Sequence, residues 1–535
     1  MKQLIQILAL CVFPLACCNA EPIAGNLPVN IPVELRHIIN ENRNAAFPSP
    51  HPDIGDIIAS FTPANIEGDA RVAGILRQKH RMKDVEHPQN ISATVNLETF
   101  LTHEELGEDT RFLFDILRHG YGGYWYFGGD GIFFRVRDLT LERLAGMDNP
   151  LQVSSYLNDL ILPALRGVIA DNHFHIHDNR FWALRPLIYM NEEFIIRKSE
   201  TGFVTEIDGV IYNVLKATPV SAPFLDGVLP TLTQEGEFAY AFGVVTQAVY
   251  SHVMKMTVLF ENPETGESHS RIIDLPRVIS RRQSAHPELL AHETGGVTIL
   301  ENKSLENQET EGLLKTFFQS GYALRDKPVL VLDLRGNRGG YELFAREWVR
   351  GYTGHPPAGS LFSAESGNLS MTASELRMPL STKFNNNEIT VLKDTIPEDI
   401  ADFLRESGFG YYVDLSLVYM NAPVLLPIPN KNLVVVLIDN NVASAGESFV
   451  GYLRQLENVL VVGTNTSGTF LTSGMVRTNL PYSNLGIRFG TELNLRPDLS
   501  QFEGIGFMPD LWVPPEESLK RVLRFVERYR LSGNN

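Results

Sequence analysis

The sequence has little cysteine and little positive charge, and each shortage excludes a class of protein. Its 535 residues contain three cysteines, and Cys11, Cys17 and Cys18 all lie within the first twenty positions. The remainder can therefore form no disulfide framework and no cysteine-ligated zinc site. Lys and Arg number 46 against 63 Asp and Glu, a formal charge of −17. This balance argues against nucleic acid as a partner, because phosphate binding needs clustered Lys and Arg.

Long hydrophobic runs are also missing. No segment after residue 20 approaches the eighteen consecutive apolar residues of a membrane-spanning helix, so we expect no integral membrane span. The first twenty residues differ, since Lys2 precedes the apolar run Leu4 to Ala16 and small residues lead to Ala20. This pattern predicts a secretory signal peptide over 1–20 and soluble export, periplasmic or secreted. The alternative is a lipid anchor, because Leu15 to Cys18 loosely resembles a bacterial lipoprotein signal.

The remaining pattern predicts three domains. Helical periodicity dominates from Leu97 to Leu165, which places a mainly helical domain at 21–180. The aromatic, glycine-rich loop Tyr121 to Gly129 within it is expected to pack the floor of that domain. Short β segments and turns fill 181–290, and an α/β pattern follows over 291–535. A Gly-, Ser-, Pro- and Asn-rich stretch at 353–430 is interpreted as an insertion over the active face.

Two strands of the α/β part read as buried on both faces. Pro328 to Asp333 and Leu433 to Ile438 are nearly continuous apolar runs, as expected in a parallel sheet covered by helices. Ser444 follows the second strand and opens an amphipathic helix that carries Phe449 and Tyr452. A serine at this junction suits a nucleophile, because it faces the positive end of the helix dipole. From this stretch alone a helix cap is the favoured interpretation, since Ser is a preferred N-cap residue and Glu447 completes a capping-box pattern.

Three histidines alternate within Asp171 to Asp178. His173, His175 and His177 are spaced by two residues, so they would share one face of a strand. Imidazoles on one face can converge on a zinc ion, which makes a metallohydrolase one alternative. Solvated or hydrogen-bonded histidines at a strand edge are at least as consistent with the pattern.

Two motifs together resemble a known family. Asp333-x-Arg335-x-Asn337-x-Gly339-Gly340, followed about a hundred residues later by Asn441-Val442-Ala443-Ser444-Ala445-Gly446-Glu447, is similar to the paired motifs of the C-terminal processing (tail-specific) and tricorn-type serine peptidases. The resemblance implies that Ser444 is the nucleophile, and that the backbone of Gly339, Gly340 and Ala445 forms an oxyanion hole. Asp333, Arg335 and Asn337 would support that loop, the first two as a buried ion pair or by bonding backbone groups.

The general base distinguishes two branches of this family. The tail-specific branch uses a lysine twenty-five residues after the serine, and that position is Thr469 here. The sequence instead resembles the Ser-His-Glu branch that includes the chlamydial protease-like activity factor. Asp171-Asn172-His173 matches its early Asp-x-His motif, and Glu503 to Asp510 matches its late Glu-x-x-Gly-Val/Phe-x-Pro-Asp motif. The resemblance implies His173 as base and Glu503 as its orienting carboxylate. His175, two residues on, is the alternative base.

The resemblance also implies an architecture and an activity. The fold class is α/β, with a crotonase/ClpP-like catalytic core, a PDZ-like β domain over 181–290 and a helical N-terminal domain. A PDZ-like domain would bind an extended peptide as an added strand. We therefore expect an exported serine endopeptidase that acts on proteins or peptides without a metal or cofactor, with a homodimer left open. The alternative is a catalytically inactive peptidase-fold protein that binds an apolar ligand or a peptide.

Overall fold

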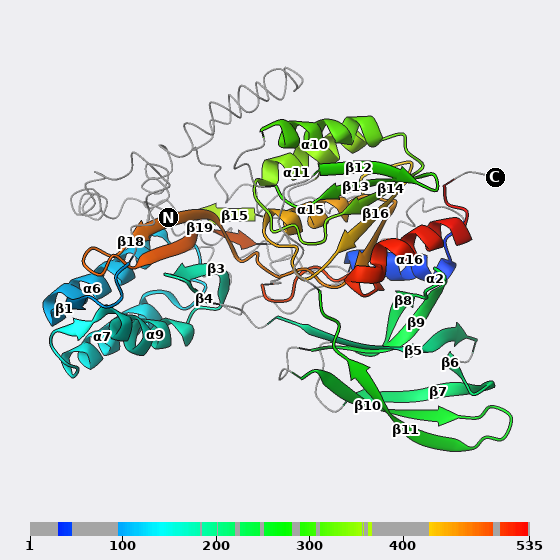
Figure 1. Cartoon of the computed structure of the whole chain (residues 1–535), viewed down its shortest axis with the longest axis horizontal. Helices are drawn as coiled ribbons and strands as arrows, with labels where there is room; N and C mark the ends of the chain where they lie inside the picture. Colours follow the sequence, from blue (N-terminus) through cyan, green and yellow to red (C-terminus); the bar gives the residue numbers. More distant parts are fainter. Residues whose placement is uncertain are drawn as a thin grey trace, which may run out of the picture.

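The computed structural model describes residues 30–44, 95–181, 185–200, 202–219, 225–246, 251–280, 289–305, 311–355, 357, 362–365, 427–495 and 503–532. Figure 1 shows three parts, which are a helical lobe, an α/β core and a sheet domain beside that core. The predicted signal peptide and almost all of the predicted insertion at 353–430 lie outside the described residues.

The α/β core is built on a six-stranded sheet. Its order is β12-β13-β14-β16-β17-β20, and all neighbouring pairs are parallel except β12 with β13. The strands are β12 Leu289–Thr294, β13 Val297–Asn302, β14 Val329–Asp333, β16 Leu433–Ile438, β17 Val459–Gly463 and β20 Leu511–Trp512. Every residue of β14, β16 and β17 is buried, which explains their continuous apolar sequences and confirms the α/β prediction.

Helices cover both faces of this sheet (Figure 1). On one face, α10 Glu311–Leu324, α11 Glu342–Thr353 and α15 Ala445–Leu453 pack through side chains such as Phe317, Trp348 and Phe449. On the other face, α2 Val33–Asn44 and α16 Pro515–Arg528 pack through side chains such as Leu35 and Phe525. The sequence placed residues 21–180 in one helical domain, whereas α2 lies against the six-stranded sheet of the α/β core.

The β-rich domain is a seven-stranded antiparallel sheet in the order β11-β10-β7-β6-β5-β9-β8. Its strands are β5 Leu187–Ser199, β6 Gly202–Ile207, β7 Val210–Pro219, β8 Leu225–Leu232, β9 Phe238–Thr246, β10 Val253–Glu261 and β11 Ser268–Pro276. A tight turn at Asp208 and Gly209 joins β6 to β7. A bridge between Tyr189 and Arg277 brings the end of β11 back to β5, so the sheet curls toward closure. Its PDZ-like character stays a prediction.

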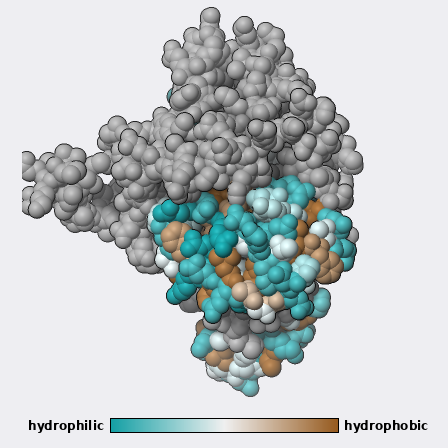
Figure 2. Space-filling model, turned by 90° about the vertical axis from the view of Figure 1, so that its left-hand side faces the viewer, coloured by the Kyte–Doolittle hydropathy of each residue, from teal (hydrophilic) through white to brown (hydrophobic). Residues whose placement is uncertain are grey.

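The helical lobe contains α6 His103–Gly120, α7 Gly129–Ala145, α8 Val153–Ser155, the π-helix η2 Tyr156–Ile161 and α9 Leu162–Arg166, with β1 Phe100–Leu101 paired to β2 Leu151–Gln152. In the aromatic loop, Tyr121 and Tyr124 are fully buried, which confirms that the loop packs the interior of this lobe. Figure 2 shows the face at the left of Figure 1, where the described residues are mostly hydrophilic with small hydrophobic patches. None of the described helices is long and apolar enough to span a membrane.

A second sheet joins the helical lobe to distant sequence. Its order is β15-β19-β3-β4, and β18 also pairs with β19. These strands are β3 Asp171–Ile176, β4 Asn179–Phe181, β15 Phe362–Glu365, β18 Thr472–Asn479 and β19 Gly486–Leu495. Ile487 and Phe489 of β19 enter the hydrophobic core of the helical lobe. The hairpin β18–β19 therefore completes a lobe whose helices lie some 300 residues earlier in the chain.

Candidate active site

Ser444 lies between β16 and α15, at the carboxyl edge of the parallel sheet, as the sequence predicts. Its backbone has φ 54° and ψ −126°, a region that residues with a side chain rarely adopt. Such a conformation costs on the order of 1–3 kcal/mol and persists only where the surroundings impose it. Ser444 is the N-cap of α15, and Glu447 accepts from its backbone N–H as in a capping box, but an ordinary cap has extended backbone angles and Ser444 does not.

A buried carboxylate holds this strained turn. Glu447 Oε2 accepts from the backbone N–H groups of Ser444 (3.1 Å) and Thr469 (2.8 Å). Its Oε1 accepts from the N–H of Gly468 (2.7 Å) and the hydroxyl of Thr466 (2.6 Å). Burial raises the pKa of Glu447, and these hydrogen bonds oppose the increase. One side chain thus fixes the serine turn to the loop Thr466–Thr472, which contains the position of the absent lysine.

Replacing Glu447 by alanine is expected to destabilise the protein by about 3 kcal/mol or more, because four buried donors would lose their acceptor. The thermal unfolding temperature of purified protein measures this. Glu527→Ala is the matched control, since that carboxylate is exposed on α16. Equal unfolding temperatures for the two variants would contradict the structural role of Glu447.

The glycine pair Gly339-Gly340 approaches Ser444 closely. Gly339 has φ 94°, and a Cβ atom on it would lie 2.7 Å from the carbonyl oxygen of Ala443 and 2.8 Å from the nitrogen of Ala445. Only glycine permits this approach. The N–H of Gly339 is already used, because it donates to Asn337 Oδ1 at 2.9 Å. Within the described part of the chain, no group accepts from the N–H of Gly340 or Ala445. Of the three predicted oxyanion donors, these two remain available.

Asn337 ties the glycine loop to the serine turn. Its carbonyl oxygen accepts from the N–H of Ala443 at 2.9 Å, and its side-chain nitrogen donates to Asn302 Oδ1 at 2.6 Å. Asn302, which ends β13, was missed at the sequence level. The carboxyl ends of neighbouring parallel strands share one edge of a sheet, so its place after a buried strand was the signal that could have identified it.

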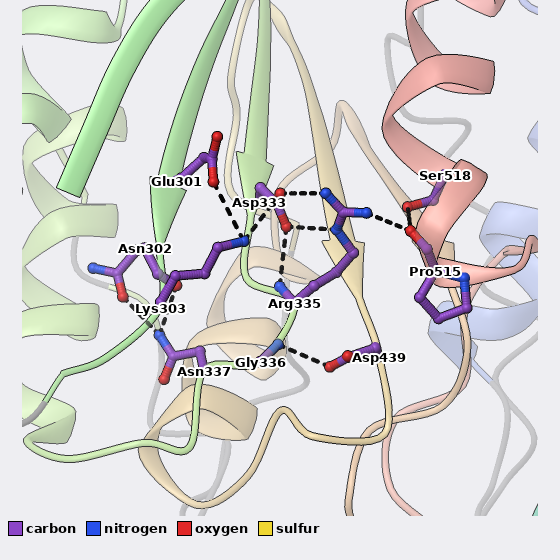
Figure 3. A network of polar contacts seen from close by, with 10 residues as sticks. All are labelled: Glu301, Asn302, Lys303, Asp333, Arg335, Gly336, Asn337, Asp439, Pro515 and Ser518. Carbon is purple, nitrogen blue, oxygen red and sulfur yellow. Dashed lines mark hydrogen bonds and ion pairs between the residues drawn. The ribbon is translucent and has the colours of Figure 1, made fainter. Parts of the chain in front are cut away.

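Figure 3 shows how the chain between β14 and the glycines is braced. Arg335 forms a buried ion pair with Asp333, with 2.5 Å between Nη2 and Oδ2, and also donates to the carbonyl oxygen of Pro515. Lys303 Nζ lies 3.1 Å from the same carboxylate. Burial alone would raise the pKa of Asp333, but the hydrogen bonds and charge of Arg335, together with Lys303, lower it. The network has the bracing geometry predicted for Asp333 and Arg335.

His173 lies on β3 with its ring buried. Asp171 accepts from the backbone N–H of His173 at 2.8 Å, and the backbone of Thr472 is hydrogen-bonded to the ring. No described residue is hydrogen-bonded to Nδ1 of the ring. Burial and, second, the charge of Arg488 lower the pKa of His173 to about 4. The imidazole is therefore neutral at physiological pH, as a general base must be.

Glu503 lies beside the same strand. Its Oε1 accepts from the N–H of Asn172 at 2.8 Å, and its Oε2 accepts from the N–H groups of Phe470 and Leu471, each at 2.6 Å. Burial and then the charge of Asp171 raise its pKa well above the ordinary value. Glu503 thus contacts the loop Thr466–Thr472 directly, whereas Ser444 is linked to the same loop through Glu447. Among the described residues, no hydrogen bond joins any two of the side chains of Ser444, His173 and Glu503.

The predicted row of three histidines is shorter in the structure. His173 and His175 lie on β3, but the strand ends at Ile176, and His177 turns away with φ 52° toward Asp178, whose Oδ2 is 3.5 Å from its Nε2. The described residues contain no group of three His, Cys, Asp or Glu side chains that could hold a metal ion. The shared strand face that suggested a metallohydrolase therefore does not extend to His177.

The fold and this edge of the sheet are typical of serine-type hydrolases, in which a strand-to-helix turn exposes the serine. Comparison with protein families assigns the class, since residues 293–513 match the model of peptidase family S41. The match covers 221 of the 535 residues and includes the serine turn and the glycine pair, and it supports serine-type peptidase activity.

Solved structures with similar folds include mature CPAF, the photosystem II D1 C-terminal processing protease and an S41 protease from Bacteroides fragilis. For mature CPAF, identity is 13% and the TM-score 0.39, over 81% of this chain and 98% of that one. The processing protease is 15% identical with a TM-score of 0.35, over 79% of this chain and 97% of that one. The Bacteroides fragilis protein is 13% identical with a TM-score of 0.32, over the same shares of the two chains. The search of curated proteins found no match to the chain.

Proposed function

We propose that the protein is an exported serine endopeptidase in which Ser444 forms the acyl-enzyme, His173 acts as general base and then acid, and Glu503 orients the imidazole. The observation that carries the proposal is the strained backbone of Ser444 next to two N–H groups, those of Gly340 and Ala445, that no described residue uses. Export is supported by the predicted signal peptide at 1–20.

In the proposed reaction, Ser444 Oγ attacks the scissile carbonyl carbon while His173 takes the hydroxyl proton. The carbonyl oxygen becomes an oxyanion, to which the N–H groups of Gly340 and Ala445 donate. Collapse of the intermediate breaks the C–N bond, and His173 gives the proton to the leaving amine. Water then repeats the sequence on the acyl ester and releases Ser444.

This reaction requires a rearrangement of the described conformation. The His173 ring must come within hydrogen-bond reach of Ser444, and its unpartnered Nδ1 must gain a carboxylate acceptor. Glu503 is the candidate, but backbone N–H groups occupy its oxygens. Both changes are local, because all the contacts to be exchanged involve the loop Thr466–Thr472 or β3. Catalytic hydrogen bonds often tighten only when substrate binds.

A fluorophosphonate probe tests the proposal directly, because it reacts covalently with activated serines. We expect the probe to label the native protein and peptide mapping to locate the adduct on Ser444. Heat-denatured protein is the control, since the activating environment is then lost. Absence of labelling in the native protein would favour the alternative, which is a peptidase-fold binding protein. This second candidate is kept because no described hydrogen bond joins the side chains of Ser444, His173 and Glu503.

The pH profile tests His173 as the base. Because the pKa of its ring is lowered to about 4, the ring stays neutral until pH falls to that value. The acidic limb of kcat/KM is therefore expected near pH 4, rather than near the 6.5 of an unperturbed histidine. Arg488→Gln should move the limb to higher pH, because the Arg488 charge is one cause of the low pKa. Arg271→Gln, in the β domain, should leave it in place; a wild-type limb above pH 6 would contradict this assignment.

A further inference from the structure

The strand β3 is irregular at His173. On one side, β3 pairs with β19 at His175 and Ile176. On the other side, its pairing with β4 changes register between Asp171 and His175. Such an irregularity disrupts the ladder, and within the described strands neither pairing includes His173. The position of this histidine therefore depends on contacts that side chains make.

Asp171 makes these contacts. Its Oδ1 accepts from the backbone N–H of His173 at 2.8 Å, and its Oδ2 accepts from the hydroxyl of Thr472, also at 2.8 Å. The backbone of Thr472 is in turn hydrogen-bonded to the His173 ring. One buried carboxylate thus anchors both the main chain of the histidine and the residue that contacts its ring.

Tyr121, at the start of the aromatic loop, holds this carboxylate. Its hydroxyl donates to Asp171 Oδ2 at 2.8 Å. The ring is fully buried and packs edge-to-face against Phe174 of β3 and Phe489 of β19, with centroids 5.2 Å and 6.1 Å away. A Cβ atom on Gly123 would lie 2.6 Å from the hydroxyl oxygen, so glycine there leaves room for the ring. The aromatic loop therefore fixes the place of Asp171.

The same short segment of β3 also contacts Glu503. The N–H of Asn172, which lies between Asp171 and His173, donates to Glu503 Oε1 at 2.8 Å. After burial, the charge of Asp171 is the next cause of the raised pKa of Glu503, so the two carboxylates lie near one another. A displacement of this segment would therefore disturb both the proposed base and its orienting carboxylate.

We propose that Asp171 is a positioning residue for the reaction, which holds His173 and the backbone of Thr472 in place and is itself held by Tyr121. This role rests on the proposed peptidase function, and it gives the aromatic loop a part in the chemistry. The hydrogen bonds of Asp171 reach no reacting atom, so it acts through the base. A misplacement of about 1 Å at a catalytic group can cost about 100-fold in rate.

Two substitutions of Asp171 separate the anchoring contacts from the rest of the fold. Asp171→Ala removes all three contacts and should lower kcat about 100-fold, with KM within about threefold of wild type. Asp171→Asn can keep them, because its amide oxygen accepts from the N–H of His173 while its NH₂ group donates to the two hydroxyls. We expect this conservative variant to retain kcat within about tenfold of wild type.

Asp109 provides a matched control in the same lobe. It is also fully buried, and its carboxylate accepts from the N–H groups of Tyr482 and Ser483, each at 2.8 Å. Asp109→Ala should destabilise the lobe as Asp171→Ala does, but kcat should stay within about threefold of wild type. Equal losses of kcat in the two alanine variants would overturn the positioning role, because they would reflect a general loss of folding.

Tyr121→Phe is a milder variant that keeps the packing of the ring. It removes one hydrogen bond to Asp171, and kcat should fall about tenfold. Tyr156→Phe is its control, because the Tyr156 hydroxyl is buried in the same lobe and is bonded to Thr110 Oγ1 at 2.9 Å. If the alanine variants fail to fold, this pair decides, and equal kcat in the two phenylalanine variants would overturn the proposal.

The pKa of the His173 ring, measured by NMR on protein with labelled histidine, does not depend on turnover. His173→Ala identifies its signal among those of the 14 histidines. Burial is the main cause that lowers this pKa to about 4, so a displaced ring in Asp171→Ala should titrate closer to about 6.5. Loss of a negative charge alone would lower the pKa further, and Asp109→Ala should leave it unchanged.

The NMR result also separates this role from the peptidase proposal. An unchanged or lower pKa of His173 in Asp171→Ala would overturn the positioning role, whatever the activity of the wild-type protein. If the wild-type protein cleaves no peptide but the pKa rises in Asp171→Ala, the peptidase proposal fails and the anchoring of His173 by Asp171 stands.

Discussion

Ser444→Ala is expected to lower kcat on a fluorescent casein substrate by about 10⁶-fold, because the acyl-enzyme cannot form without the hydroxyl. The residual rate should still exceed that of the uncatalysed reaction by about 10³-fold, since the N–H groups of Gly340 and Ala445 would remain to polarise the carbonyl. Alanine tolerates the φ of 54° no worse than serine does, so the variant should fold normally.

The exposed Ser270 on β11 offers a matched control. Ser270→Ala should retain wild-type kcat, and both variants should unfold at the wild-type temperature. A Ser444→Ala protein with activity within tenfold of wild type would show that another group is the nucleophile.

His173→Ala is expected to lower kcat almost as far as Ser444→Ala, because a serine hydroxyl is a weak nucleophile without an adjacent base. The double variant Ser444→Ala/His173→Ala should be no slower than Ser444→Ala alone. Residues that act as one unit are not additive, so this comparison measures whether the two side chains cooperate. Kinetics of the four proteins under one set of conditions provide the test.

His175→Ala distinguishes the two histidines. His175 lies on the same strand, two residues from His173, and the charges of Arg180 and Arg488 lower the pKa of both histidines. We expect the kcat of His175→Ala to stay within about tenfold of wild type, because this substitution changes the surroundings of the proposed base and removes no reacting group. If His175→Ala is the severe variant and His173→Ala the mild one, the alternative base of the sequence analysis is the correct one. Additive losses in the double variant would contradict a shared proton transfer.

The sequence was sufficient where the determinants are local. The apolar run of β16 and the helical spacing after it predicted the turn at Ser444, because both patterns occupy adjacent residues. The bracing role of Asp333 and Arg335 also followed from positions two residues apart at the end of one strand. The positive φ of Ser444 could not be predicted from the residue type, because serine has no preference for that region of backbone angles.

Long-range contacts could not be predicted from the sequence. The availability of Gly340, and not Gly339, as a donor depends on where the side chain of Asn337 points, and that is set by Asn302 on another strand. The backbone donors that occupy Glu503 come from β3 and from the loop after β17, which periodicity cannot pair. The position of α2 against the catalytic sheet is similarly nonlocal, because an amphipathic helix does not specify which apolar surface it will cover.

The pairing of β19 with β3 has a consequence for the order of biosynthesis. Ile487 is paired with Ile176, and the candidate triad extends from His173 to Glu503. During synthesis at about 5–20 residues per second, β3 must wait roughly 15–60 seconds for its partner strand. A nascent chain in which β3 and β4 have emerged therefore has no complete helical lobe and no complete site. If the proposed triad is correct, the protein cannot cleave peptides until almost all of it has been made.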